Sequence, residues 1–140
     1  MDSTTRIGKY LTLADCTKSA TAKASNIDNT PSDEQVVSMK LVAENIFDKV
    51  KEKFPKAFAS SFFRSVDLNK KIGGAKTSQH CKGEAVDIDS NDQNAEIFEW
   101  VKANLEYDQL IWEKGNSKSP AWVHVSFKEK NNRQQVLKIV

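Results

Sequence analysis

The chain has 140 residues, of which 29% are charged and 39% hydrophobic, and its formal net charge is +2. This length suits one domain, here residues 1–140, with a core that needs no disulfide or structural metal. The nearly balanced charge argues against nucleic acid or an anionic membrane as partner, and no apolar run approaches the ~20 residues of a membrane span. We therefore expect a monomer with no nucleic-acid partner and no membrane insertion.

The N-terminal segment predicts synthesis in the cytoplasm without a signal peptide, because residues 1–6 contain no apolar core. Residues 1–30 are polar and are interpreted as an arm packed on the domain, with Thr12 capping one helical turn. Cys16 and Cys81 are the only cysteines. We interpret them as free thiols, since a lone pair is weak evidence for a disulfide. A disulfide between them, or Cys81 as a metal ligand, are the alternatives.

The first long helix is predicted over residues 31–53. Thr30 or Ser32 is the expected cap, Pro31 suits the first helical position, and Pro55 ends the helix. Apolar residues recur at helical spacing and predict one stripe that faces the core. These residues are Val36, Met39, Ala43, Ile46, Phe47, Val50 and Phe54.

A second helix is predicted after Ser90 or Asn91, either of which would cap it. One of its faces carries Ala95, Phe98, Val101 and Leu105. Five segments predict strands, at residues 59–66, 84–89, 108–113, 121–127 and 134–140, with a loop over 67–77. Together these elements predict an α+β domain in which two main helices pack on a small antiparallel sheet.

The candidate chemistry is concentrated in two segments that hold both histidines of the chain. His80 is followed by Asp87, and His124 lies far downstream. Two imidazoles and one carboxylate suit Zn²⁺, and three protein ligands leave a fourth position for water, as in catalytic zinc sites. Strand alternation places Asp87 beside small Ala85 on one face and turns Glu84 away. The alternative is two ordinary, partly buried histidines with Asp87 as a polar partner.

A hydrolytic site also needs a base for the water and a cation for the developing oxyanion. Glu113 is the candidate base, because it ends the strand before the chain returns to His124; the alternative is an exposed strand-end carboxylate. Arg64 is the candidate clamp for oxyanion and carboxylate, because its fork can hold two oxygens; the alternative is a surface arginine. Ser78 either hydrogen-bonds substrate or shapes the loop before His80.

The motif Ser78-x-His80-x-x-Gly83-x-Ala85-x-Asp87, followed by Trp122-Val123-His124-Val125-Ser126, resembles the zinc D-Ala-D-Ala peptidases. These include VanX- and VanY-type dipeptidases and carboxypeptidases, and phage L-alanyl-D-glutamate endolysins. Similarity at residues 63–65 and 72–75 and along the N-terminal arm is to a compact, phage-associated branch. The resemblance therefore covers nearly the whole chain.

The resemblance implies a Hedgehog/DD-peptidase-like fold and hydrolysis of peptide bonds in peptidoglycan stem or cross-link peptides. Zn²⁺ would be held by His80, Asp87 and His124, Arg64 would stabilise the transition state, and Ser78 would contact substrate. Many members carry an acidic residue three positions before the last histidine, where this chain has Ala121. Either Glu113 has taken that role from the neighbouring strand, or the chain binds zinc and cleaves poorly.

We therefore expect a zinc-dependent carboxypeptidase or endopeptidase that acts on the bacterial cell wall after release or delivery. Two rival hypotheses stay open. One is a zinc-dependent module that binds wall peptides without cutting them, which Ala121 favours. The other is a structural virion component with a relict site.

Overall fold

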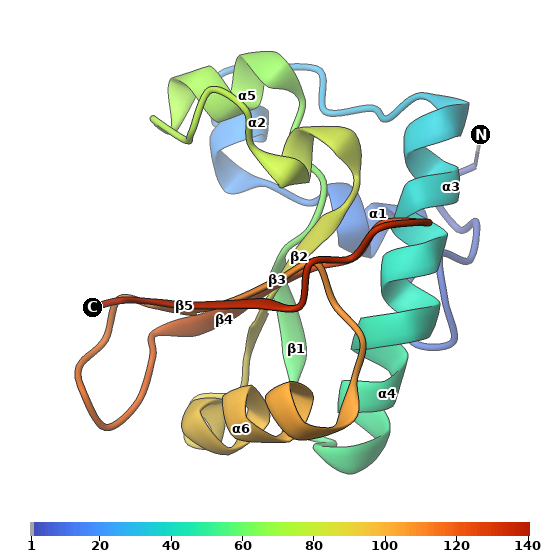
Figure 1. Cartoon of the computed structure of the whole chain (residues 1–140). Helices are drawn as coiled ribbons and strands as arrows, with labels where there is room; N and C mark the ends of the chain where they lie inside the picture. Colours follow the sequence, from blue (N-terminus) through green and yellow to red (C-terminus); the bar gives the residue numbers. More distant parts are fainter. Residues whose placement is uncertain (1) are drawn as a thin grey trace.

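The computed structural model describes residues 2–140, and within them a five-stranded sheet forms the centre of the fold (Figure 1). The strands are β1 (Phe58–Ser61), β2 (Ala85–Asp89), β3 (Gln109–Glu113), β4 (Trp122–Ser126) and β5 (Gln135–Ile139). The helices are α1 (Leu13–Thr17), α2 (Ala20–Ala24), α3 (Asp33–Val42), η1 (Ala43–Phe47), α4 (Asp48–Lys53), α5 (Val66–Lys71), η2 (Gln79–Lys82) and α6 (Asn94–Asn104). Across residues 2–140, none of these helices has both the length and the apolar character that crossing a membrane requires.

The sheet has the order β1-β2-β4-β3-β5. Its first four strands pair antiparallel, as predicted, whereas β5 pairs parallel to β3. The expectation of a wholly antiparallel sheet is therefore wrong at this edge. The reason is topological: β5 runs opposite to β4 but lies on the far side of β3, so it runs in the direction of β3. The predicted α+β class is confirmed.

The long helix predicted over residues 31–53 is the continuous column α3–η1–α4 in Figure 1. Ser32 is its N-cap: Ser32 Oγ accepts from Gln35 N, and Gln35 Oε1 accepts from Ser32 N. Pro31 therefore precedes the cap instead of occupying the first helical position. The helix ends at Lys53, before Pro55, as predicted. All seven residues of the predicted apolar stripe are buried in the core.

The segment after β1 departs from the prediction. The strand ends at Ser61, because Phe62 and Phe63 both turn into the core and cannot alternate across a sheet. Ser65 then caps α5 by accepting from Leu68 N, so a short helix occupies part of the predicted loop over 67–77. Arg64 consequently lies on the connection between β1 and α5, and its predicted position on a strand is wrong.

The second helix, α6, begins later than predicted, at Asn94. Asn91 has a φ of 73°, a left-handed conformation that an N-cap does not adopt. Ser90 Oγ instead accepts from Gln93 N, at 2.9 Å, in the turn before the helix. Phe98 and Val101 are buried as predicted, and Ala95 and Leu105 are partly buried against the same core.

The N-terminal arm contributes to the same core. Thr12 caps α1 in a capping box with Asp15, which confirms the predicted helical turn. Cys16 on α1 is buried, and burial raises the pKa of its thiol to about 12. Cys16 and Cys81 are both free thiols, as interpreted from the sequence.

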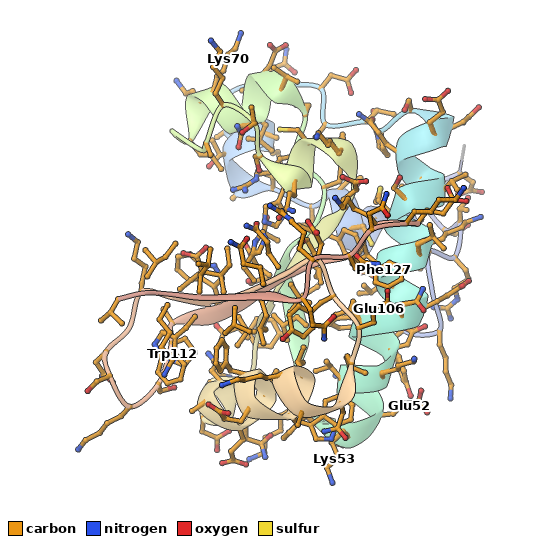
Figure 2. All side chains as sticks on the ribbon, viewed as in Figure 1. Glu52, Lys53, Lys70, Glu106, Trp112 and Phe127 are labelled. Atoms are coloured by element: carbon orange, nitrogen blue, oxygen red, sulfur yellow. The ribbon has the colours of Figure 1, made fainter. Side chains whose placement is uncertain are left out.

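The two faces of the sheet have different neighbours. Trp112 points from β3 towards α6 (Figure 2) and meets Phe98 edge to face, with ring centroids 5.2 Å apart. The buried residues that share its face on β3 and β4 complete this side of the core: Leu110, Val123 and Val125. The opposite face is turned towards η2, α5 and α2 (Figure 1), and it carries the polar residues described next.

Candidate metal centre

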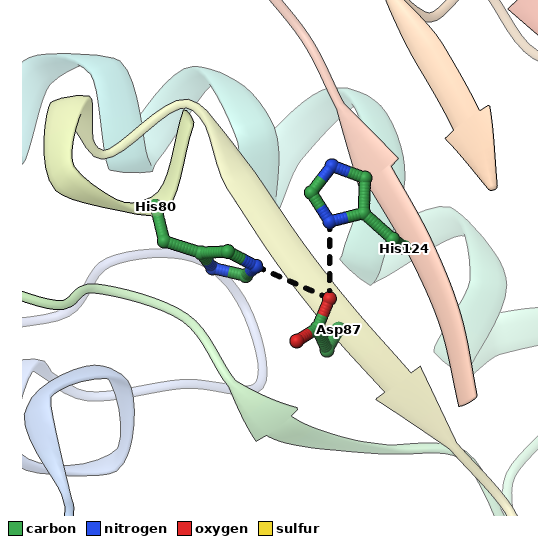
Figure 3. A group of neighbouring side chains, drawn as sticks. All are labelled: His80, Asp87 and His124. Atoms are coloured by element: carbon green, nitrogen blue, oxygen red, sulfur yellow. Dashed lines mark hydrogen bonds and ion pairs between the residues drawn. The ribbon is translucent and has the colours of Figure 1, made fainter. Parts of the chain in front are cut away.

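Three side chains with metal-ligand atoms meet on this second face of the sheet (Figure 3). His80 comes from η2, Asp87 from β2 and His124 from β4. All three are buried, and their ligand atoms lie within 4.8 Å of one another. Both rings turn towards one carboxylate oxygen: Asp87 Oδ1 is 3.2 Å from His80 Nε2 and 3.1 Å from His124 Nδ1.

Strand pairing explains two of the three positions. β2 and β4 are paired so that Asp87 lies directly opposite His124, and Ala85 opposite Ser126. Residues opposite each other in an antiparallel pair point to the same face, so the predicted placement of Asp87 on the face of His124 is confirmed. We call His80, Asp87 and His124 the metal group, because they are the candidate ligands. Glu84 precedes the strand and does not belong to the group.

His80 is positioned by the short helix η2. Ser78 caps it, and Ser78 Oγ accepts from His80 N at 3.2 Å. Gly83 ends it in a left-handed conformation, with a φ of 74°. A Cβ added at Gly83 would lie 2.6 Å from the backbone oxygen of Gln35, so the turn after His80 has room only for glycine.

Replacing Gly83 with alanine is expected to lower the free energy of unfolding by about 1–3 kcal/mol, through backbone strain and the clash with Gln35. Urea denaturation followed by circular dichroism measures the loss. Gly73→Ala is the matched control, because Gly73 has nearly the same φ, 75°, but nothing within 4 Å of its added Cβ. Equal losses in the two variants would contradict the assigned close approach at Gly83.

The outer nitrogen of each imidazole has an acceptor in the protein. His80 Nδ1 lies 2.7 Å from the backbone oxygen of Phe62, and His124 Nε2 lies 3.0 Å from Gln79 Oε1. Both acceptors are oxygens, so each imidazole can donate through its outer nitrogen while a metal ion takes the place of the hydrogen on its inner nitrogen. This is the arrangement of metal-binding histidines, whose second nitrogen is usually hydrogen-bonded.

Asp87 provides the negative charge of the group. Burial raises the pKa of this carboxyl, but the charges and hydrogen bonds of His80 and His124 outweigh burial and lower it. The carboxyl is therefore an anion between two imidazoles. Two imidazole nitrogens and a carboxylate oxygen converging in a buried position fit the donor set of a zinc site with an open fourth position.

A cavity of about 400 Å³ borders the metal group. Its lining includes Arg64, Ser78 and Glu113, so the structure brings together every site residue named from the sequence. Glu113 reaches it because β3 pairs with β4: Ile111 lies opposite His124, and Glu113 is two residues further on the same face. Burial raises the pKa of Glu113 above that of an ordinary glutamate, since the side chain is half-buried.

Arg64 and Ser78 are in contact with each other. Arg64 Nη2 donates to Ser78 Oγ at 3.4 Å, and the same oxygen also accepts from His80 N. Ser78 therefore shapes the loop, and because it borders the cavity, its hydrogen bond to substrate stays a prediction. Cys81 does not belong to the metal group; its Sγ lies 4.0 Å from the backbone oxygen of Ser65.

Two further polar residues next to the metal group were missed from the sequence. Gln79 Nε2 donates to Asp108 Oδ2 at 3.0 Å, and its Oε1 faces His124. Asp108 is fully buried and is also bound by Arg133, whose Nε and Nη2 donate at 2.9 and 2.8 Å. The one local signal was the amide of Gln79 inside the motif, between Ser78 and His80.

Asp108 is expected to stabilise the fold in a pH-dependent way. The hydrogen bonds from Arg133 lower the pKa of its carboxyl from 3.8 to about 2. A lowered folded-state pKa contributes stability above the unfolded-state value, and about 2 kcal/mol of it should be lost as the pH falls from about 4 to below about 2. Urea denaturation should therefore show that the stability difference between wild type and Asp108→Asn narrows by this amount on acidification. A difference that does not change with pH would contradict the assignment.

The fold and the site together define a class: a mixed α+β domain with a buried group of two histidines and an aspartate at the wall of an open cavity. Residues 9–126, well over half of the chain, match the family described as Peptidase M15. The chain belongs to the Peptidase M15 family. This assignment confirms the resemblance to the D-Ala-D-Ala peptidases, while the phage-associated branch stays a prediction. A search of curated proteins gave no match.

Proposed function

We propose that the chain is a zinc-dependent peptidase that hydrolyses peptide bonds in peptidoglycan stem or cross-link peptides. One observation carries the proposal: the buried convergence of His80, Asp87 and His124 on a cavity that also holds Glu113 and Arg64. Membership of a peptidase family supports the same reaction class. The protein would act at the cell wall after release or delivery.

His80, Asp87 and His124 would hold the zinc ion. Bound Zn²⁺ supplies an acidified water, with a pKa of ~7, and polarises the scissile carbonyl. The acceptors behind the two imidazoles, Phe62 O and Gln79 Oε1, support this role, because they leave the inward nitrogens free to coordinate.

Glu113 would be the general base. It would accept a proton from the attacking water and return it to the nitrogen of the leaving amine. Its position on the cavity face beside His124 supports this assignment, and so does the raised pKa of its half-buried carboxyl. Ala121, at the position where many relatives carry the acidic residue, donates its backbone N–H to Glu113 O at 2.9 Å. The two positions are therefore neighbours across the pair of strands.

Arg64 would bind the carbonyl oxygen of the scissile bond as negative charge develops on it. Within residues 2–140, Arg64 Nε is buried without a hydrogen-bond partner, and Nη2 makes only the long contact with Ser78. The guanidinium therefore has donors left for substrate. Ser78, in contact with Arg64, would help to place the substrate in the cavity.

A zinc-dependent binding module for wall peptides is the second candidate. It is favoured by Ala121, which cannot serve as a base and is exposed. In such a module Glu113 would contact peptide without transferring a proton.

Digestion of purified peptidoglycan with the zinc-loaded protein tests the proposal and separates the candidates. Mass spectrometry of the soluble products should show released D-alanine for a carboxypeptidase, or new amine termini within stem peptides for an endopeptidase. Binding to peptidoglycan in a sedimentation assay without any new amine would favour the binding module. If the zinc-loaded protein neither binds nor cleaves peptidoglycan, both candidates are contradicted.

A further inference from the structure

The environment of His124 extends beyond the three metal-ligand residues. Its Nε2 contacts Gln79, Gln79 contacts Asp108, and Asp108 contacts Arg133, so four side chains form one hydrogen-bonded series. They come from β4, η2, the residue before β3 and the β4–β5 connection. Arg133 lies outside residues 9–126, the part of the chain that matches the family. Because these four residues are far apart in the sequence, only the tertiary structure brings them together.

We propose that Asp108 is a positioning residue for the metal centre, acting through Gln79 on the ring of His124. The inference rests on the zinc site of the proposed function. Asp108 fixes the Gln79 amide so that its oxygen accepts from Nε2 of His124, the nitrogen that keeps its hydrogen when Nδ1 binds the metal.

The first step of the argument concerns the amide of Gln79. The two ends of an amide differ, since its nitrogen only donates and its oxygen only accepts. An ionised carboxylate only accepts, so Asp108 requires the Gln79 nitrogen on its side. The 3.0 Å contact between Gln79 Nε2 and Asp108 Oδ2 has this polarity. The Gln79 oxygen is then necessarily turned towards His124.

The second step concerns the imidazole. Gln79 Oε1 lies 3.0 Å from His124 Nε2 and can only accept, so Nε2 must carry the hydrogen. Nδ1 lies 3.1 Å from Asp87 Oδ1, which is also an acceptor, inside the group that would hold the metal. A metal ion bound there would take the place of a hydrogen on Nδ1. The ring would then keep one hydrogen, on Nε2, and Gln79 Oε1 would accept it.

The third step concerns the rigidity of Asp108 itself. Its carboxylate is fully buried, and the backbone N–H and the guanidinium of Arg133 donate to it. Lys128 Nζ lies 3.6 Å away on the same side. With these cations in place the carboxylate stays ionised and fixed, so it always requires a hydrogen-bond donor from Gln79. A purely structural role in holding the β4–β5 connection would not require the contact with Gln79.

The test uses two variants that break the series at different points. Asp108→Asn removes the requirement for a donor from Gln79. An asparagine can itself donate to Gln79, so the Gln79 amide is free to rotate. Gln79→Met keeps the length of the side chain and removes both hydrogen bonds. Both variants are expected to bind zinc about 10- to 100-fold more weakly than wild type in chelator competition, as for other residues behind metal-binding histidines. The double variant should be no weaker than the weaker single variant, since both act through one bond.

Nitrogen-15 NMR of the histidine rings in the zinc-loaded protein gives a readout independent of activity. In the wild type the Nε2 hydrogen of His124 should exchange slowly with water, because Gln79 accepts it, and in both variants it should exchange faster. Asp48→Asn is the matched control: Asp48 is also buried and accepts from Lys9 N, but it lies on α4 and does not border the cavity. This control should keep wild-type zinc affinity and the wild-type exchange rate.

Wild-type zinc affinity in both variants would overturn the inference, as would an unchanged exchange rate of the Nε2 hydrogen of His124. If Asp108→Asn does not fold, Gln79→Met decides alone, because its side chain is only half-buried and its loss should be tolerated. Absence of zinc binding in the wild type would reject the proposed function, and with it the metal centre on which the inference rests. Zinc binding that neither variant weakens would reject the inference alone.

Discussion

Glu113→Gln is expected to lower kcat on peptidoglycan peptides by about 100- to 10,000-fold, the range that general base catalysis contributes. Zinc content should stay at the wild-type level, because Glu113 does not belong to the metal-ligand group. The amide keeps the shape of the side chain and removes its ability to accept a proton. Steady-state release of amine, measured beside metal analysis of the same preparation, checks both parts of the prediction.

Glu84→Gln is the matched control for this variant. Glu84 is also half-buried, and burial also raises the pKa of its carboxyl, but it does not border the cavity at the metal group. It should retain wild-type kcat. Full activity in Glu113→Gln would remove Glu113 from the role of base. Loss of zinc in that variant would show that Glu113 acts on the metal centre instead of on the proton.

His124→Ala is expected to abolish stoichiometric zinc binding and, with it, all turnover. The variant leaves His80 and Asp87 as the only members of the described ligand group, and two protein ligands do not make a stable zinc site. Metal analysis after dialysis against trace zinc measures the first effect, and peptidoglycan digestion measures the second. Circular dichroism establishes whether the sheet is retained.

Glu113→Gln is the reference for interpreting His124→Ala, because the two variants should lose activity for different reasons. Only the histidine variant should lose its metal. One equivalent of zinc retained by folded His124→Ala would show that the metal group is wrongly assigned. Activity that persists in His124→Ala without zinc would reject the metallopeptidase proposal.

Local chemistry made much of the fold predictable. The capping residues Thr12 and Ser32 were named because their hydroxyl groups satisfy N–H groups only a few positions away. The apolar stripe of the long helix was predictable because its period is set by the helix itself. The boundaries of β1 and α6 were not, since Phe62 and Phe63 follow the core instead of the strand pattern, and Asn91 adopts a left-handed turn.

The sequence by itself determined the candidate metal ligands. His80 and His124 were the only histidines, and strand alternation selected Asp87 over Glu84, a choice that depends only on neighbouring backbone geometry. Only the tertiary structure decided what surrounds them. The pairing of β3 with β4 carries Glu113 to the cavity, and the β4–β5 connection carries Arg133 to Asp108 and so reaches His124 through Gln79. Such contacts join residues far apart in the chain, and strand register and loop path, which determine them, leave no periodic signal in the sequence.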